Sequence, residues 1–185
     1  MTVDEIFSKI VSHMAKGLLI HDQISIMFGF LNLEGYQKQH EYQYYSESIE
    51  YKNIQNYFLE HYYKIIQLEE IKKPDIIPPT WYKYSKMDVD ISTKRSTIKT
   101  LMKKWIDWET DTKNELQKYY KELLDLGEIC SDLKLSDFLK DVDNELVIAQ
   151  TEYLNLEAIG YDMSEIVNRQ EALYKKYTKQ IKHLF

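Results

Sequence analysis

The 185-residue chain has few of the residues that interrupt or cross-link a fold. Its 5 glycines and 3 prolines are too few for a turn-rich all-β protein, so this scarcity favours helices. The single cysteine, Cys130, cannot form an intramolecular disulfide, which indicates a reduced compartment. The residues from Met1 to Phe7 carry acids where a secretory signal carries bases, and we therefore expect a cytoplasmic location.

Long apolar runs and an excess of positive charge are also absent. The longest apolar run extends from Ile24 to Leu31, far short of the ~20 residues that span a bilayer, so no membrane partner is expected. Acidic residues outnumber basic ones, 30 to 24, which disfavours nucleic acid as a partner. The sequence contains no glycine-rich phosphate loop, no Ser-His-Asp or Cys-His nucleophile arrangement and no zinc-like Cys/His spacing.

Apolar residues at helical spacing run through most of the chain, which predicts one helical domain covering residues 1–185. Thr2 and Glu5 form a capping box, so we expect the first helix to start near Val3 and to run into the thirties. A second buried stripe extends from Tyr44 to Ile65.

Three further helices are expected in the second half. One is capped by Ser92 and stops at Gly127. The next begins near Ser131 or Ser136 and ends at Gly160, and Ser164 then caps a short fifth helix.

The prolines mark one long connection between the second and third helices. All three lie between Glu70 and Ser92, which predicts a crossover over residues 71–91. Antiparallel neighbours need only short loops, so a long connection means that these two helices run parallel. The prediction is an all-α, ferritin-like four-helix bundle with a short C-terminal fifth helix.

Three segments resemble the ferritin superfamily, and most closely its mini-ferritins, the DNA protection during starvation (Dps-like) proteins. His40-Glu41-Tyr42-Gln43-Tyr44 is similar to the end of a mini-ferritin first helix, and the segment from Ile54 to Tyr62 to its second helix. Leu135 to Leu139, followed by Glu145, is similar to a ferritin segment in which Phe-Leu precedes an acid. The resemblance implies iron binding or storage, or stress protection.

The ligands implied by this resemblance are incomplete. Gln43, Gln55 and Leu59 stand where a mini-ferritin has two histidines and an acid, at a site that it completes between two subunits. Against the di-iron pattern inside a ferritin bundle, the chain offers Gln23 and Phe58-x-x-His61. The residues expected to bind iron are therefore His61, Glu145, Glu109 and Glu115. Such a set predicts no efficient ferroxidase; the alternative is a metal-free bundle used for assembly or partner binding.

Two polar groups have more than one interpretation. His21, Asp22 and Gln23 interrupt an apolar stretch and fit a polar network inside the bundle, a subunit contact or a solvent-facing surface. Glu47 and Glu50 fit the turn between the first two helices, where mini-ferritins have a loop, or an acid pair that binds a cation. Helical periodicity also permits a helix through that point.

Aromatic residues are abundant, with 16 tyrosines. Tyrosine buries a large ring while keeping its hydroxyl hydrated, so packing and interface roles are favoured. The resemblance implies self-association as a dimer or a larger, often dodecameric, shell. We expect at least a dimer.

Overall fold

The computed structural model describes residues 1–85 and 89–185, without the side chains of 129–134, and so leaves the Cys130 side chain outside the described residues. Five α-helices and one 3₁₀ helix make up its secondary structure, and no strand occurs in the described ranges. The elements are α1 (Val3–Phe30), α2 (Glu34–Tyr62), η1 (Pro79–Lys83), α3 (Ile91–Asp125), α4 (Ile129–Ala158) and α5 (Met163–Leu184). None of the described helices combines the length and the apolar character that a membrane-spanning segment requires.

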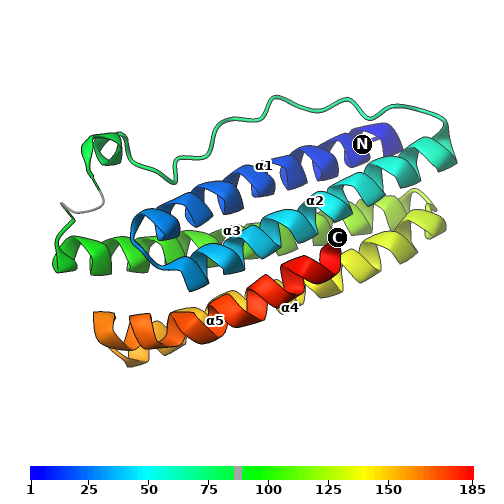
Figure 1. Ribbon diagram of the computed structural model, residues 1–185. Helices are drawn as coiled ribbons and strands as arrows, with labels where there is room; N and C mark the ends of the chain where they lie inside the picture. The colour runs from blue at the N-terminus through cyan, green and yellow to red at the C-terminus, as the bar shows by residue number, and fades with distance from the viewer. Residues whose placement is uncertain (86–88) are drawn as a thin grey trace.

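The four long helices form a bundle of two hairpins, with α1 against α2 and α3 against α4 (Figure 1). The connection from α2 returns along the length of the bundle before α3 begins, so α2 and α3 run in the same direction (Figure 1). This confirms the predicted ferritin-like topology. The fifth helix is the shortest of the five, with 22 residues, and packs along α2.

The turn between α1 and α2 lies earlier than the resemblance implied. The capping box is confirmed, since Thr2 Oγ1 accepts from the Glu5 amide and Glu5 Oε2 accepts from the Thr2 amide. However, α1 ends at Phe30, and Asn32 turns the chain with a left-handed φ of 59°. Asparagine tolerates this conformation better than most residues, so no glycine or proline is needed. Placing Glu47 and Glu50 in this turn was therefore wrong, because both lie inside α2.

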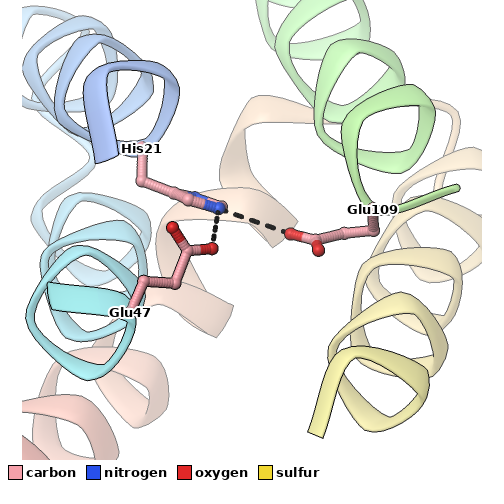
Figure 2. A group of neighbouring side chains, drawn as sticks. All are labelled: His21, Glu47 and Glu109. Carbon is pink, nitrogen blue, oxygen red and sulfur yellow. Dashed lines mark ion pairs between the residues drawn. The ribbon is translucent and has the colours of Figure 1, made fainter. Parts of the chain in front are cut away.

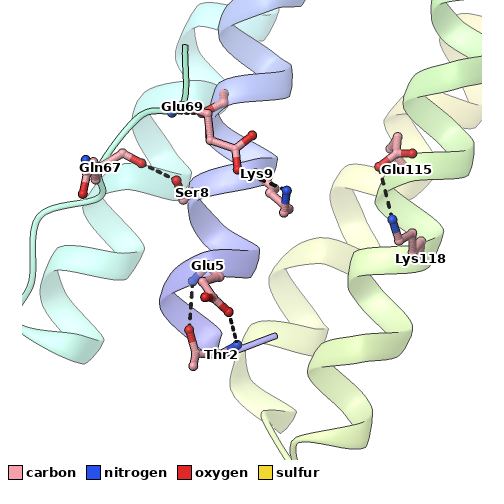
Figure 3. Close-up of polar contacts among 9 residues, drawn as sticks. Thr2, Glu5, Ser8, Lys9, Gln67, Glu69, Glu115 and Lys118 are labelled. Atoms are coloured by element: carbon pink, nitrogen blue, oxygen red, sulfur yellow. Dashed lines mark hydrogen bonds and ion pairs between the residues drawn. The ribbon is translucent and has the colours of Figure 1, made fainter. Parts of the chain in front are cut away.

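The crossover begins earlier than predicted, because α2 ends at Tyr62. Ile65, expected in the buried stripe, is 91% exposed in the connection. The connection lies along the outside of α1, where Ser8 Oγ donates to the Gln67 carbonyl and Lys9 Nζ pairs with Glu69 at 3.1 Å (Figure 3). Ile76 is buried in the core. These contacts hold the segment on the bundle.

Aspartates, not the expected serines, cap the later helices. Asp90 accepts from the Thr93 amide at the start of α3, and Asp162 accepts from the Ser164 amide at the start of α5. Each cap therefore lies two residues before the serine chosen from the sequence. The start of α4 at Ile129 likewise precedes both expected serines.

The apolar core is divided by a layer of polar residues. One cluster surrounds Trp105 and Phe28, and the other surrounds Phe7 and Phe58 near the opposite end of the bundle. Between them, the helices direct polar side chains inward: His21, His40, Gln43, Glu109 and Thr112 are buried, and Glu47 is partly exposed. Burying such groups is unfavourable unless they pair, so this polar layer is the candidate functional region of the bundle.

The helices α2 and α5 approach closely at Gly35. A Cβ on this residue would lie 2.0 Å from the Gln170 carbonyl oxygen, closer than any van der Waals contact permits. Farther along the same interface, Gln39 Nε2 donates to the buried Tyr177 hydroxyl at 3.1 Å. Only glycine at position 35 lets α5 lie this close to α2.

We predict that Gly35→Ala lowers the free energy of unfolding by about 1 to 3 kcal/mol, because α5 must move away from α2. Gly29→Ala is the matched control, since its new methyl group meets only the flexible end of the Gln37 side chain. It should be neutral or gain up to about 1 kcal/mol from helix propensity. Urea unfolding measures both, and equal stabilities for the two variants would contradict the close-approach argument.

Candidate metal centre

Three ionisable side chains from three helices meet in the polar layer. Nε2 of His21 on α1 lies 3.0 Å from Glu47 Oε1 on α2 and 3.4 Å from Glu109 Oε1 on α3 (Figure 2). One ligand atom from each residue lies within 4.8 Å of the other two. The His21 and Glu109 side chains are 0% and 1% exposed, so water does not solvate these charges.

Neighbouring residues fix the orientation of each member. Gly17 leaves room for the Glu47 carboxylate, because a Cβ there would lie 2.8 Å from Glu47 Oε2. On α3, Trp105 Nε1 donates to Glu109 Oε1 at 2.8 Å. Nδ1 of His21 lies 3.1 Å from Nδ1 of the fully buried His40, so the two rings are joined by one hydrogen bond. Nε2 of His21 therefore faces the carboxylates.

Burial and charge shape the protonation of the centre. Burial disfavours the His21 imidazolium, but the Glu47 and Glu109 carboxylates outweigh this, so the pKa of His21 is raised well above its usual value. Burial together with the nearby His21 lowers the pKa of His40 far below its usual value, which keeps that ring neutral. Burial also raises the pKa of Glu109, although the His21 ring opposes this rise. Without a metal, the layer is an imidazolium paired with carboxylates.

Two carboxylate oxygens of the centre have no hydrogen-bond partner. These are Glu47 Oε2 and Glu109 Oε2, both buried. Buried polar atoms are nearly always satisfied, so each exception needs an explanation. Carboxylate oxygens and an imidazole nitrogen are ligands of ferrous and other first-row transition-metal ions. The donor set therefore fits such an ion.

A third carboxyl group adjoins the centre from α4. Burial raises the pKa of Glu145 well above its usual range, and the Glu109 and Glu47 charges raise it further. Glu47 and Glu145 also line a small internal cavity of about 10 Å³. All four helices of the bundle thus contribute an ionisable side chain to one region.

The structure brings together two of the four residues expected to bind iron. Glu109 is in the centre and Glu145 adjoins it, whereas His61 and Glu115 lie elsewhere. His61 is in the last turn of α2, about 21 Å along the helix from Glu47, and its exposed ring stacks on Tyr57. Glu115 is partly exposed on α3, 4.0 Å from Lys118 (Figure 3).

His21 and Glu47 are the members that were not among the residues expected to bind iron. Of the three interpretations for residues 21–23, the polar network inside the bundle holds for His21, while Gln23 is buried and Asp22 is exposed. Glu47 was assigned to a turn because the resemblance fixed the register. The signal that could have found it is the stripe Tyr36, His40, Gln43, Glu47, which recurs at three- and four-residue steps in α2.

Comparisons with known proteins support the fold. No family model and no curated protein matches the chain. Among solved structures, an engineered closed form of Archaeoglobus fulgidus ferritin has a TM-score of 0.75 and 11% identity, covering 94% of this chain and 96% of that one. A humanized archaeal ferritin has a TM-score of 0.76 at 13% identity, covering 94% and 97%. A PmFTN variant soaked in iron has a TM-score of 0.74 at 10% identity, covering 91% and 97%. The chain therefore has the ferritin-like fold.

One more histidine, His13, lines the internal cavity, and its buried environment favours the neutral form of the ring. Its ring stacks on Trp108 at 4.4 Å, and its Nε2 lies 2.9 Å from Thr112 Oγ1. Burial, with a smaller contribution from Lys16, lowers the pKa of His13 from 6.5 to about 4. As the pH falls, the unfolded chain therefore binds a proton at His13 at a higher pH than the folded chain does.

Because the pKa of His13 is lower in the folded chain than in the unfolded chain, His13 lowers the free energy of unfolding as the pH falls from 6.5 toward 4. Between pH 7 and pH 5.5, His13→Gln should lose about 1 kcal/mol less unfolding free energy than the wild type, because glutamine does not titrate. Urea unfolding at both pH values gives the comparison, and His61→Gln serves as an exposed control. Identical losses in the wild type and His13→Gln would contradict the prediction.

Proposed function

We propose that this protein is a ferritin-like iron-binding protein whose centre holds one ferrous ion inside the bundle. His21, Glu47 and Glu109 are the proposed ligands, and Glu145 is the adjoining fourth group. The single observation that carries the proposal is the convergence of the buried His21 imidazole, the buried Glu109 carboxylate and the partly exposed Glu47 carboxylate, with one ligand atom of each within 4.8 Å of the others. Iron is the cargo in this proposal, which extends to storage or stress protection.

The charges of the centre support a cationic occupant. With the His21 ring neutral, as a metal ligand must be, Glu47 and Glu109 supply two negative charges in a region that excludes water. A divalent cation balances them, and the unpartnered Glu47 Oε2 and Glu109 Oε2 supply additional donor atoms. Removing His21 or Glu109 should therefore weaken binding more than removing any exposed residue of the same type.

The position of the centre bears on the type of ferritin-like protein. All proposed ligands come from one chain, as in the ferritin pattern inside the bundle, whereas the mini-ferritin pattern is completed between subunits. The sequence positions that match the mini-ferritin ligands are Gln43, Gln55 and Leu59. The proposal therefore favours a ferritin type of centre over a Dps-like one.

We predict that the protein binds about one equivalent of Co²⁺, a redox-stable substitute for Fe²⁺, in a calorimetric or absorbance titration. His21→Gln and Glu109→Gln should each weaken binding by at least ~100-fold, more than the 10- to 100-fold typical of residues behind the ligands. His61→Gln and Glu115→Gln are the matched controls and should bind like the wild type. Loss of binding in these controls, with binding retained in His21→Gln, would place the site elsewhere.

We also predict that the protein does not rapidly oxidise Fe²⁺ in air. A di-iron centre has about six protein ligands, mostly carboxylates, and the proposed centre has four groups. Ferric absorbance should grow at the rate of the buffer alone. Oxidation faster than the buffer that is abolished by Glu109→Gln would show that a second iron is bound and would require a larger ligand set.

A second candidate function is assembly or partner binding without metal. The observation that favours it is the ion pair itself, because protonated His21 already neutralises one of the two carboxylates. Apolar side chains are also exposed on the bundle, including Val147 and Leu154, two turns apart on α4. We propose that such residues pack between copies of the chain.

Self-association predicts at least a dimer in solution. Light scattering at micromolar concentration should give two or more times the 22.3 kDa chain mass. Leu154→Lys should shift the protein toward monomer, because it places charge on an exposed apolar surface, while Glu171→Lys on the solvent side of α5 is the control. A monomeric wild type would remove the assembly proposal.

A further inference from the structure

A cleft of about 290 Å³ lies between α2, α4 and α5, beside the polar layer. Gln43 and Ser46 line it from α2, Asp141 and Glu145 from α4, and Lys176 and Gln180 from α5. None of these residues belongs to the His21, Glu47 and Glu109 group. The cleft opens to the surface, since Asp141 and Lys176 are exposed.

Glu145 connects this cleft to the interior. It lines both the cleft and the small cavity that Glu47 also lines. Its side chain lies deep in the protein and nevertheless keeps partial exposure, because it opens into the cleft. A cation in the cleft would meet Glu145 first and Glu47 next.

The inner wall of the cleft presents oxygen atoms that lack partners. Oε1 of Gln43 is unpartnered, although the residue is only 3% exposed. Oε1 of Gln180, on the opposite wall, is also buried and unpartnered. Amide oxygens accept hydrogen bonds from the water shell of a hydrated cation, or coordinate the ion directly.

The opposite approach to the centre is less suited to a cation. A groove between α1, α3 and the crossover is lined by Lys9, Lys16 and Lys72 against Glu69 and Glu70, and among its described residues no buried side-chain nitrogen or oxygen lacks a partner. His13 lines both this groove and the internal cavity. Its ring closes the passage by stacking on Trp108 and bonding to Thr112.

We propose that a hydrated divalent cation enters through the cleft between α2, α4 and α5, and that Glu145 passes it to Glu47. The inference rests on the proposed metal centre for its destination. Helix α5 forms one wall and brings the Lys176 ammonium to the cleft, with Nζ 3.3 Å from the Tyr177 hydroxyl. This ammonium repels an entering cation, so α5 sets the rate of entry.

The first test measures Co²⁺ loading by stopped-flow absorbance, together with affinity at equilibrium. Lys176→Ala should load about threefold faster, whereas Lys179→Ala, on the same helix but outside the cleft, should load like the wild type. Asn144→Trp narrows the cleft and should slow loading at least tenfold with less than a threefold change in affinity. Lys72→Trp in the opposite groove is its control, and slower loading in Lys72→Trp but not in Asn144→Trp would overturn the proposal.

The second test requires no metal. In a Cys130→Ser background, the thiol of Glu145→Cys should react at least tenfold faster with a cationic methanethiosulfonate than with an anionic one. Adding Asn144→Trp should slow the reaction, while adding Lys72→Trp should not. An unreactive thiol, or one without preference for the cation, would refute the cleft as the entrance.

The two tests separate the two proposals. If the wild type binds no Co²⁺ but the thiol reacts as expected, the metal centre is refuted and the cleft stands as a cation-selective approach to Glu145. If Co²⁺ binds but neither Asn144→Trp nor Lys176→Ala changes its loading rate, the centre stands and the entrance is refuted.

Discussion

The ion pair between His21 and the carboxylates of Glu47 and Glu109 is the constraint on which the rest of the bundle depends. A charge buried without a partner costs several kcal/mol, so α1, α2 and α3 must keep a common register where these residues meet. Gly17 and Trp105 serve this register, the first by leaving room for Glu47 and the second by donating to Glu109. The apolar clusters on either side then hold the layer in place.

The crossover and α5 cover different sides of this layer, and they shield it from water to different degrees. On the α1 side, the crossover is held by several polar contacts, and the stacked rings of His13 and Trp108 close the passage inward. On the other side, α5 buries only Ile166 and Tyr177 and leaves unpartnered amide oxygens facing α2 and the cleft. Because water can satisfy such atoms, the α5 side is the more permeable one.

An imidazole in the centre changes its chemistry relative to a site built from carboxylates alone. Protonated His21 stabilises the carboxylates when no metal is bound, so the fold does not need metal to balance its buried charge. A metal must displace the proton on Nε2, while the contact between His21 Nδ1 and His40 can persist. The buried charge of the centre can therefore be balanced by the His21 proton or by a cation.

The all-α class, the four long helices, the capping box at Thr2 and the parallel course of α2 and α3 could all be predicted from the sequence. These features follow from local signals: apolar periodicity, a cap and a proline-bearing connection. Glu109 and Glu145 could also be predicted from the sequence as candidate ligands, since each lies on the inward-facing stripe of its helix.

Which residues meet inside the bundle could not be predicted from local patterns and depends on how the helices pack. The turn after Phe30 depends on one left-handed asparagine inside a continuous apolar pattern, and its position far before Glu47 places Glu47 inside α2 and not in a loop. For the same reason, His61 matched a ligand motif by spacing yet lies at an exposed helix end. Local patterns fix which face of a helix is buried, but the depth at which a residue meets its partners is set by how the helices align along the bundle.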